Sequence, residues 1–408
     1  MTEDQAVKAD HVDTVGDQES EIADPLVART HAQTGRSRRL ASRTINGIGW
    51  VPTTAVLIVV GCRVVTVLLV AIINRFAMGK VTDSLTIWDG SWFLRIVHNG
   101  YPSRLPMVAD HVAANPIAFF PLFPLTVRGV ASVGLDPGVV ALAVSALTGV
   151  CAVVAVGRLA RHMRGDAAGE RAAVLFALCP GAFAFSFAYA EGTLITLVAF
   201  GLIALLDRRW LVAGLLGALA TATSPVGLAF VVACAAAAAV DIVRHRRMQS
   251  LVAPVVAPLG FIAYMAYLWA HTGSLFAWRL TERGGWQSFP SLRYPLHIIW
   301  TFVSDPLQPT LTGHILFIGT VAGIIGCVLM IRERQALPVL AYGIATVALA
   351  AISQPVGLRP RFLMLAFPIV IALATRYSGR TYRVLVAASA VLLALLSVYE
   401  ISSRAVFP

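Results

Sequence analysis

The chain has 408 residues, of which 58% are hydrophobic and only 13% are charged, and its mean hydropathy is +0.76. A soluble domain covers its surface with far more polar residues than this, so lipid has to be the solvent for most of the chain. The formal net charge of +11 does not indicate a nucleic-acid partner, because the basic residues, nearly all arginines, form short clusters between long apolar runs.

The first 45 residues differ from the rest of the chain. They are rich in acidic residues and hold few large apolar side chains, so burial cannot offset the entropy cost of ordering them. They are not a signal peptide, because acids precede the first apolar run where basic residues should stand. We therefore predict a disordered cytoplasmic tail at 1–45 and a single membrane domain at 46–408.

Long apolar segments follow one another through the membrane domain. A membrane-crossing helix needs about 20 apolar residues, and fewer where its neighbours shield it or the bilayer thins. On this basis we expect an all-α polytopic protein, a bundle of about eleven transmembrane helices. The predicted spans are 51–73, 139–157, 172–188, 193–206, 211–223, 226–241, 250–270, 311–331, 336–352, 361–376 and 383–399.

The arginine clusters in the short loops predict the orientation of the bundle. With the amino terminus in the cytoplasm, all six clusters fall on the cytoplasmic side. They lie at 36–43, 158–171, 207–209, 244–247, 332–334 and 376–383. This alternation requires that 117–130, which contains Pro121 and Pro124, lies along the outer interface rather than crossing. The outer face then receives long loops at 74–138 and 271–310 and short ones at 189–192 and 353–360, and long loops usually carry function.

Residues 87–102 of the first outer loop hold the densest group of polar and aromatic side chains. Trp92 and Ile96 stand four residues apart and Gly100 is placed like a helix stop, which predicts a short amphipathic helix in the interface. Asp89 stands at its amino end. It is either the N-cap of this helix or a carboxylate that the helix fixes in space for chemistry, and the two roles are compatible.

A proline-rich segment, AFFPLFPL at 118–125, follows this helix. Taken with the preceding pattern WDG-W-F-L-x-I-x-x-x-G-Y at 88–101, it resembles the glycosylphosphatidylinositol mannosyltransferase II family and its bacterial relatives, within the GT-C superfamily. The segments SFAYAEGT at 186–193 and AGLLGALA at 213–220 are similar to further parts of that family. One departure stands at 223–225, where this chain has Thr-Ser-Pro and the family would have an arginine.

The resemblance implies a GT-C-like bundle with interfacial helices in the first extracytoplasmic loop. It implies a transferase that takes a sugar, most simply mannose, from a polyprenyl-phosphate carrier and passes it to a hydroxyl of a glycan or glycolipid, with no cofactor. The chemistry needs a base for the acceptor proton, and Asp89 is the candidate catalytic residue. Inversion at the anomeric carbon follows from a single displacement with the lipid phosphate as leaving group.

Candidate substrate contacts surround this base in the outer loops. Glu191, between two spans, is placed to contact a substrate hydroxyl or an arginine, or as a loop-tip acid it simply faces water. Arg359 and Arg361 lie on the outer side although loop arginines favour the cytoplasm, so they either bind the leaving phosphate or extend to lipid headgroups. The weaker candidates are Trp88, His98, Arg279 and Arg283.

A metal site has no support in the sequence. The five cysteines stand far apart inside apolar segments, the histidines of the outer loops are scattered, and no DxD pair stands on the outer face. We predict that the protein requires no metal.

Three alternatives stay open at this level. The sugar could be arabinofuranose, because nothing in Asp89, Glu191 or the arginines encodes it. A lipid or solute transporter would place ionisable residues in mid-span and show internal repeats, whereas here the spans are nearly free of charge, apart from Arg63, and no repeat is visible. A non-catalytic assembly subunit would tolerate replacement of Asp89.

Overall fold

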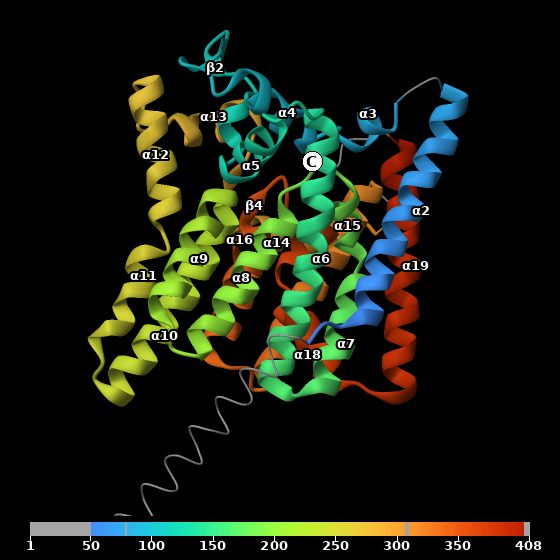
Figure 1. The fold of residues 1–408 in the computed structure, drawn as a ribbon, viewed down its shortest axis with the longest axis vertical. Coiled ribbons are helices and arrows are strands. Elements are labelled where there is room, and N and C mark those ends of the chain that lie inside the picture. The colour runs from blue at the N-terminus through green and yellow to red at the C-terminus, as the bar shows by residue number, and fades with distance from the viewer. Residues whose placement is uncertain (1–49, 78–79, 307–309, 404–408) are drawn as a thin grey trace, which may run out of the picture. The chain divides into compact units, whose positions relative to one another are not determined.

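The computed structural model describes residues 50–77, 80–306 and 310–403, so the predicted tail at 1–45 lies outside the described residues. From Val51 onward the chain forms one unit, and it is almost entirely helical (Figure 1). The α-helices are α2 (Thr53–Ala77), α3 (Val81–Leu85), α4 (Asp89–Asn99), α5 (Leu122–Ala131), α6 (Pro137–Arg164), α7 (Asp166–Ala177), α8 (Glu191–Leu206), α9 (Trp210–Thr223), α10 (Leu228–His245), α11 (Val252–Val256), α12 (Leu259–Thr272), α13 (Ala277–Gly285), α14 (Tyr294–Ser304), α15 (Leu311–Arg332), α16 (Leu337–Ile352), α17 (Pro360–Leu365), α18 (Pro368–Arg376) and α19 (Gly379–Ser403). The 3₁₀ helices are η1 (Pro116–Ala118), η2 (Pro180–Ser186), η3 (Pro225–Gly227) and η4 (Met248–Leu251). The strands are β1 (Met107–Val108), β2 (His111–Val112), β3 (Phe289–Pro290) and β4 (Ser353–Gln354).

The predicted all-α polytopic class is confirmed, but the helices that are long enough to cross are fewer than the predicted spans. Among the described residues, six helices are long and apolar enough, or seven if α7 and η2, bent by 70°, form one span. The shorter apolar helices α5, α8, α9 and α16 have 10–17 residues. The predicted span at 361–376 is divided between α17 and α18, because Pro368 begins a new helix after Phe367.

Of these short helices, α8 lies inside protein rather than against lipid. In α8, Leu194, Ile195, Val198 and Leu202 are all at most 2% exposed. Close contact with neighbouring helices comes from glycines: a Cβ at Gly217 of α9 would stand only 2.6 Å from the Cβ of Ala257. Small residues at helix contacts are how membrane bundles bring their backbones together. A helix shielded in this way does not need the full length of a lipid-facing span.

The arginine-rich turns meet at one end of the unit. His162 Nε2 lies 3.3 Å from Asp207 Oδ1, which links the α6–α7 turn to the α8–α9 turn. Arg376 Nη1 lies 3.8 Å from Glu333 Oε1, which links the end of α18 to the end of α15. This end is the lower one in Figure 1. The later arginine clusters thus share one side, as predicted, and their assignment to the cytoplasm stays a prediction.

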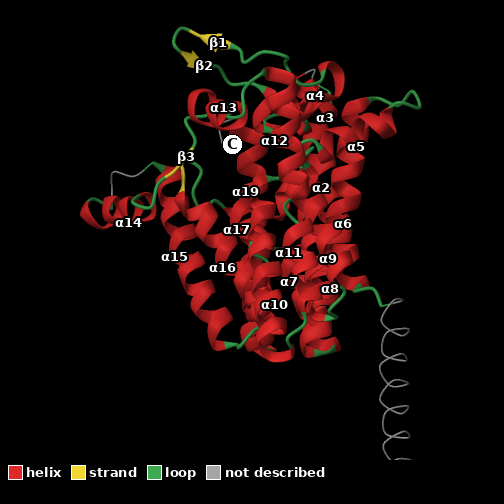
Figure 2. Ribbon diagram, turned by 90° about the vertical axis from the view of Figure 1, so that its left-hand side faces the viewer, coloured by secondary structure: helices red, strands yellow, loops and turns green. Residues whose placement is uncertain are grey.

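The opposite end carries the outer loops. Figure 2 shows α4, α13 and the β1–β2 hairpin above the ends of the long helices. Helix α4 ends at Gly100, whose φ of 72° suits glycine, as the sequence predicted. Helix α5 has 10 residues, a length of about 15 Å, so it is too short to cross a bilayer. The β3–β4 pair, with Phe289 opposite Gln354, joins the 271–310 loop to the 353–360 loop.

Candidate active site

Asp89 is the first residue of α4, and its carboxylate is engaged away from that helix. The N-cap of α4 is Trp88, with no side-chain capping bond, so the interpretation of Asp89 as the N-cap is wrong. Arg361 of α17 donates from Nη2 to Asp89 Oδ2 at 2.7 Å. Trp88 itself has a φ of 58°, a conformation that costs a non-glycine residue of the order of 1–3 kcal/mol.

Arg361 joins three segments that are remote in the sequence. Its Nε lies 3.7 Å from Glu191 Oε1, at the start of α8. Its guanidinium carbon stands 4.9 Å from the ring centre of Tyr189 and 4.6 Å from that of Phe362. The side chains of Arg361, Asp89 and Glu191 are 9%, 19% and 11% exposed. The site is therefore a nearly dry ion cluster in which each charge depends on its partners.

The electrostatics of the cluster follow from its burial and its charges. Burial and the neighbouring charge of Asp89 raise the pKa of the Tyr189 hydroxyl well above its usual value. Burial also lowers the pKa of the Arg361 guanidinium, but the carboxylates of Asp89 and Glu191 together raise it above its usual value. Arg361 is therefore a permanent cation, and as a single positive charge it faces two carboxyl groups.

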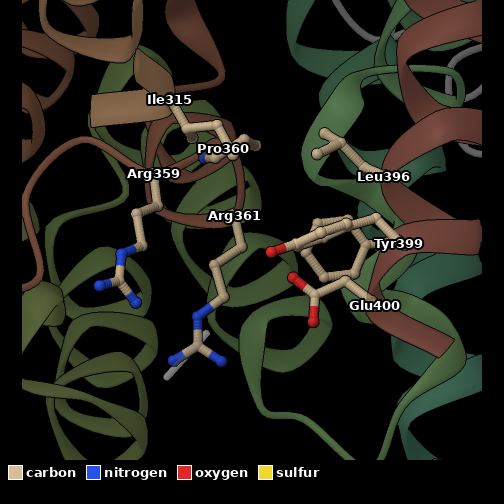
Figure 3. A pocket seen from close by; sticks show the side chains of 8 residues that line it. Ile315, Arg359, Pro360, Arg361, Leu396, Tyr399 and Glu400 are labelled. Carbon is tan, nitrogen blue, oxygen red and sulfur yellow. The ribbon is translucent and has the colours of Figure 1, made fainter. Parts of the chain in front are cut away.

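Arg359 lies beside this cluster at the start of α17 and is 8% exposed. It lines a cavity of about 20 Å³ together with Arg361 and Glu400 (Figure 3). Burial, and then the like charge of Arg361, lower the pKa of Arg359. The cationic side chains of Arg359 and Arg361, two residues apart in the sequence, thus both line one small space.

Two glycines let the backbone of 358–360 lie where it does. A Cβ at Gly181 of η2 would stand 2.4 Å from the carbonyl oxygen of Pro360, and one at Gly319 of α15 would stand 1.8 Å from that of Leu358. No side chain could occupy either place without moving the segment. Tyr294 adds a hydrogen bond from its hydroxyl to the carbonyl of Pro355 at 2.9 Å. The arginines are held by close packing on both sides of their backbone.

The remaining predicted site residues do not join the cluster. His98 is exposed near the end of α4, and Arg279 and Arg283 are exposed on α13. In the part of the chain that the structure describes, none of these three forms an ion pair with Asp89 or Glu191 within 4.0 Å. Trp88 adjoins Asp89 in the sequence and packs against the main hydrophobic core.

A cluster of aromatic side chains joins α4 to the ends of η1 and α13. Trp92 stacks on Phe119 with ring centres 6.0 Å apart and meets Trp286 edge-on at 5.2 Å. Arg95 stands over Trp92 at 4.2 Å. Clusters of aromatic side chains are typical of sugar-binding surfaces and of the lipid interface.

Three residues of the site region escaped the sequence analysis. Tyr189 belongs to the segment SFAYAEGT at 186–193, but its contact with Arg361 depends on the fold. Glu400, 7% exposed, is an acidic residue in the last apolar helix, and an acid in such a helix is itself a sign of function. Glu282 of α13 had no signal: burial raises its pKa to about 7, and the charge of Asp89 contributes to the rise.

The described residues contain no group of three or more His, Cys, Asp or Glu side chains that could hold a metal ion. The independence of the protein from metals stays a prediction.

Comparison with known proteins gives only distant similarity. No protein-family profile matches the sequence, and no curated protein matches it significantly. ArnT from Cupriavidus metallidurans, bound to undecaprenyl phosphate, is 17% identical with a TM-score of 0.48, over 74% of this chain and 57% of that one. The oligosaccharyltransferase AglB from Archaeoglobus fulgidus, in complex with an inhibitory peptide and a dolichol-phosphate, is 16% identical with a TM-score of 0.39, over 83% and 55%.

This chain spans about half the length of these structures, 57% and 55%. Similarity at this level establishes no function for the present chain, so the functional argument rests on its own side chains.

Proposed function

We propose that this chain is a membrane glycosyltransferase that takes a sugar from a polyprenyl-phosphate carrier and passes it to a hydroxyl of a glycan or glycolipid. The observation that carries the proposal is the convergence of Asp89, Glu191 and Arg361 from three remote segments. The Arg361 guanidinium lies 2.7 Å from Asp89 Oδ2 and 3.7 Å from Glu191 Oε1. The sugar that we propose is mannose, on the strength of the motifs at 88–101 and 118–125.

Asp89 is the proposed general base. It takes the proton of the acceptor hydroxyl while the acceptor oxygen forms its bond to the anomeric carbon, and the bond from that carbon to the phosphate oxygen breaks. A single displacement of this kind inverts the anomeric centre and needs no second nucleophilic carboxylate. The proposed role of Glu191, 11% exposed, is to hold the sugar by accepting a hydrogen bond from one of its hydroxyl groups.

Arg359 and Arg361 are the proposed donors to the leaving phosphate. Negative charge grows on that phosphate as the bond breaks, and preorganised cations in a dry site stabilise such charge far more than they would in water. Arg361 contacts the base at 2.7 Å and also lines the cavity that Arg359 lines. It is therefore placed between the two ends of the reaction, where the proton is taken and where the phosphate leaves.

The proposed site faces away from the cytoplasm. The arginine-rich turns share the end of the unit opposite α4 and α13 (Figure 1). Short cytoplasmic loops carry an excess of arginine, so the end with α4 is the extracytoplasmic one. The proposed donor fits this position, because a polyprenyl-phosphate sugar is itself a membrane lipid and can reach a site at this end of the helices.

The proposal is tested with purified protein in nanodiscs, radiolabelled polyprenyl-phosphate mannose or arabinofuranose, and a membrane glycolipid extract as acceptor. We expect transfer from the mannose donor, and a loss of about 100- to 10,000-fold on Asp89→Asn, the scale of general-base removal. The matched control is Asp110→Asn, whose side chain is 98% exposed on the β1–β2 hairpin and should leave transfer unchanged.

Two outcomes would count against the proposal. Full transfer by the Asp89→Asn protein would remove the base from the mechanism, and failure to consume either donor would remove the reaction. The orientation has its own test, in which Asp89→Cys is introduced into a protein without native cysteines. Labelling of that cysteine by membrane-impermeant reagents only from the cytosolic side would place the site on the wrong face.

A further inference from the structure

A buried carboxyl group faces the arginine pair from the last helix. Glu400, near the end of α19, lines the cavity with Arg359 and Arg361 and is 7% exposed. Figure 3 shows Glu400 and Tyr399 pointing from α19 toward Arg361. Both guanidinium groups act electrostatically on Glu400, yet it forms no ion pair within 4.0 Å in the part of the chain that the structure describes.

The cavity is too small for a phosphate as it stands. Its volume of about 20 Å³ admits roughly one water molecule, since a single water needs about 10–15 Å³ measured in this way. A phosphate group is several times larger than a water molecule. An anionic headgroup can reach the arginines only if a lining side chain moves, and Glu400 is the anionic side chain among those that line the space.

The charges of the site lead to the same conclusion. Asp89, Glu191 and Glu400 bring three carboxyl groups to the guanidinium groups of Arg359 and Arg361. With every group ionised the formal charge is negative, so the closed site would repel a phosphate. The site becomes attractive to an anion when the Glu400 charge withdraws or is neutralised.

Helix α19 can make such a movement because it lies at the edge of the bundle. Its outward residues Val391, Leu395 and Val398 are 58%, 62% and 54% exposed, which indicates a lipid-facing surface. Its inner surface packs on η2 and α7. A shift of its last turns would carry Glu400 away from the arginines and open the cavity from the side of the lipid.

We propose that Glu400 is a built-in counter-ion of the Arg359–Arg361 pair, which occupies the anion subsite in the empty protein and is displaced by the phosphate of a lipid. This inference rests on the proposed function, because it takes the arginine pair as the phosphate subsite. It makes Glu400 a competitor of the donor: its charge weakens donor binding and keeps other small anions out of the empty site.

The test measures binding of undecaprenyl phosphate to the full chain in maltoside detergent, by the shift of the thermal midpoint and by titration of tryptophan fluorescence. Glu400→Gln should bind roughly tenfold more tightly than the wild type, a change of about 1.4 kcal/mol. Glu400→Met, an apolar replacement that suits a membrane helix, should bind more tightly as well and serves if the glutamine variant folds poorly. Glu170→Gln, the same substitution in α7, should bind like the wild type.

Further arms separate the possible ligands and the two proposals. Inorganic phosphate should bind far more weakly than the lipid, and equal binding would mean that the subsite takes free phosphate. Unchanged or weaker lipid binding by both Glu400 variants would overturn the role of Glu400, even if sugar transfer is observed. Tighter binding without any transfer would support the role of Glu400 and refute the proposed enzyme. Absence of lipid binding in every variant would overturn both.

Discussion

Gly319 tests whether close packing places the arginine pair. A Cβ at this position of α15 would lie 1.8 Å from the carbonyl oxygen of Leu358, whereas real Cβ contacts below 3.0 Å are essentially absent. Gly319→Ala therefore has to move the two backbones apart by more than 1 Å. Leu358 is 1% exposed and directly precedes Arg359, so the movement passes to the arginines.

We expect two effects of Gly319→Ala. Overpacking of this kind costs about 1–3 kcal/mol, which should lower the thermal midpoint in detergent. A displacement of about 1 Å at a catalytic group can lower the rate by about 100-fold, so sugar transfer should fall by a comparable factor. Both are measured on purified protein, by intrinsic fluorescence on heating and by radiolabelled donor.

The matched control is Gly61→Ala in α2, where a Cβ meets nothing within 4 Å. Alanine should be neutral there or add up to about 1 kcal/mol, because glycine weakens a helix interior. Gly181→Ala, with its Cβ 2.4 Å from the carbonyl oxygen of Pro360, should act like Gly319→Ala. The reasoning fails if Gly319→Ala retains the stability and transfer rate of the Gly61→Ala protein.

Three further predictions concern charge and hydrogen bonding. Arg361→Met leaves the carboxyl groups of Asp89 and Glu191 buried without a cation and should lower the free energy of unfolding by about 3–5 kcal/mol. Adding Asp89→Asn and Glu191→Gln to this variant should restore most of the lost stability. If the triple variant does not recover in thermal midpoint, the electrostatic account is contradicted. The raised pKa of Glu282, about 7 against 4.5, means that the folded protein binds this proton more tightly, so stability should fall by up to about 3 kcal/mol as the pH rises from 4.5 to 7. In Glu282→Gln, the thermal midpoint should fall less steeply between pH 4.5 and 7 than in the wild type. An unchanged slope would refute the role given to Glu282. Asn115→Ala should lower the free energy of unfolding by about 1–3 kcal/mol, because the Asn115 side chain is 2% exposed, accepts a hydrogen bond from the backbone N–H of Ile117 and donates one to Thr281 at 3.1 Å. An unchanged thermal midpoint would show that the bond to Thr281 does not hold the first outer loop to α13.

Local features of this protein could be read from the sequence. The helix that begins at Asp89 and ends at Gly100 follows from side-chain spacing and from a glycine with a φ of 72°, both of which act within a few residues. The grouping of the arginine-rich turns follows from counting apolar segments, because each crossing reverses the side of the next loop. The lengths of the spans could not be read in this way, since the shielding of α8 comes from how it packs against α6, α9 and other helices.

The site depends on contacts that no local pattern encodes. Arg361 and Asp89 stand 272 residues apart, and their bond decided that the Asp89 carboxylate engages an arginine instead of capping α4. The positions of Glu400 beside the arginines and of Gly319 against Leu358 likewise depend on how α15, α17 and α19 pack. Spacing and composition determine which segments become helices and which face carries charge, because helix formation and the partition between lipid and water depend on neighbouring residues and on the solvent. Which side chains meet is decided by the packing of the whole bundle, where one missing Cβ sets the approach of two backbones.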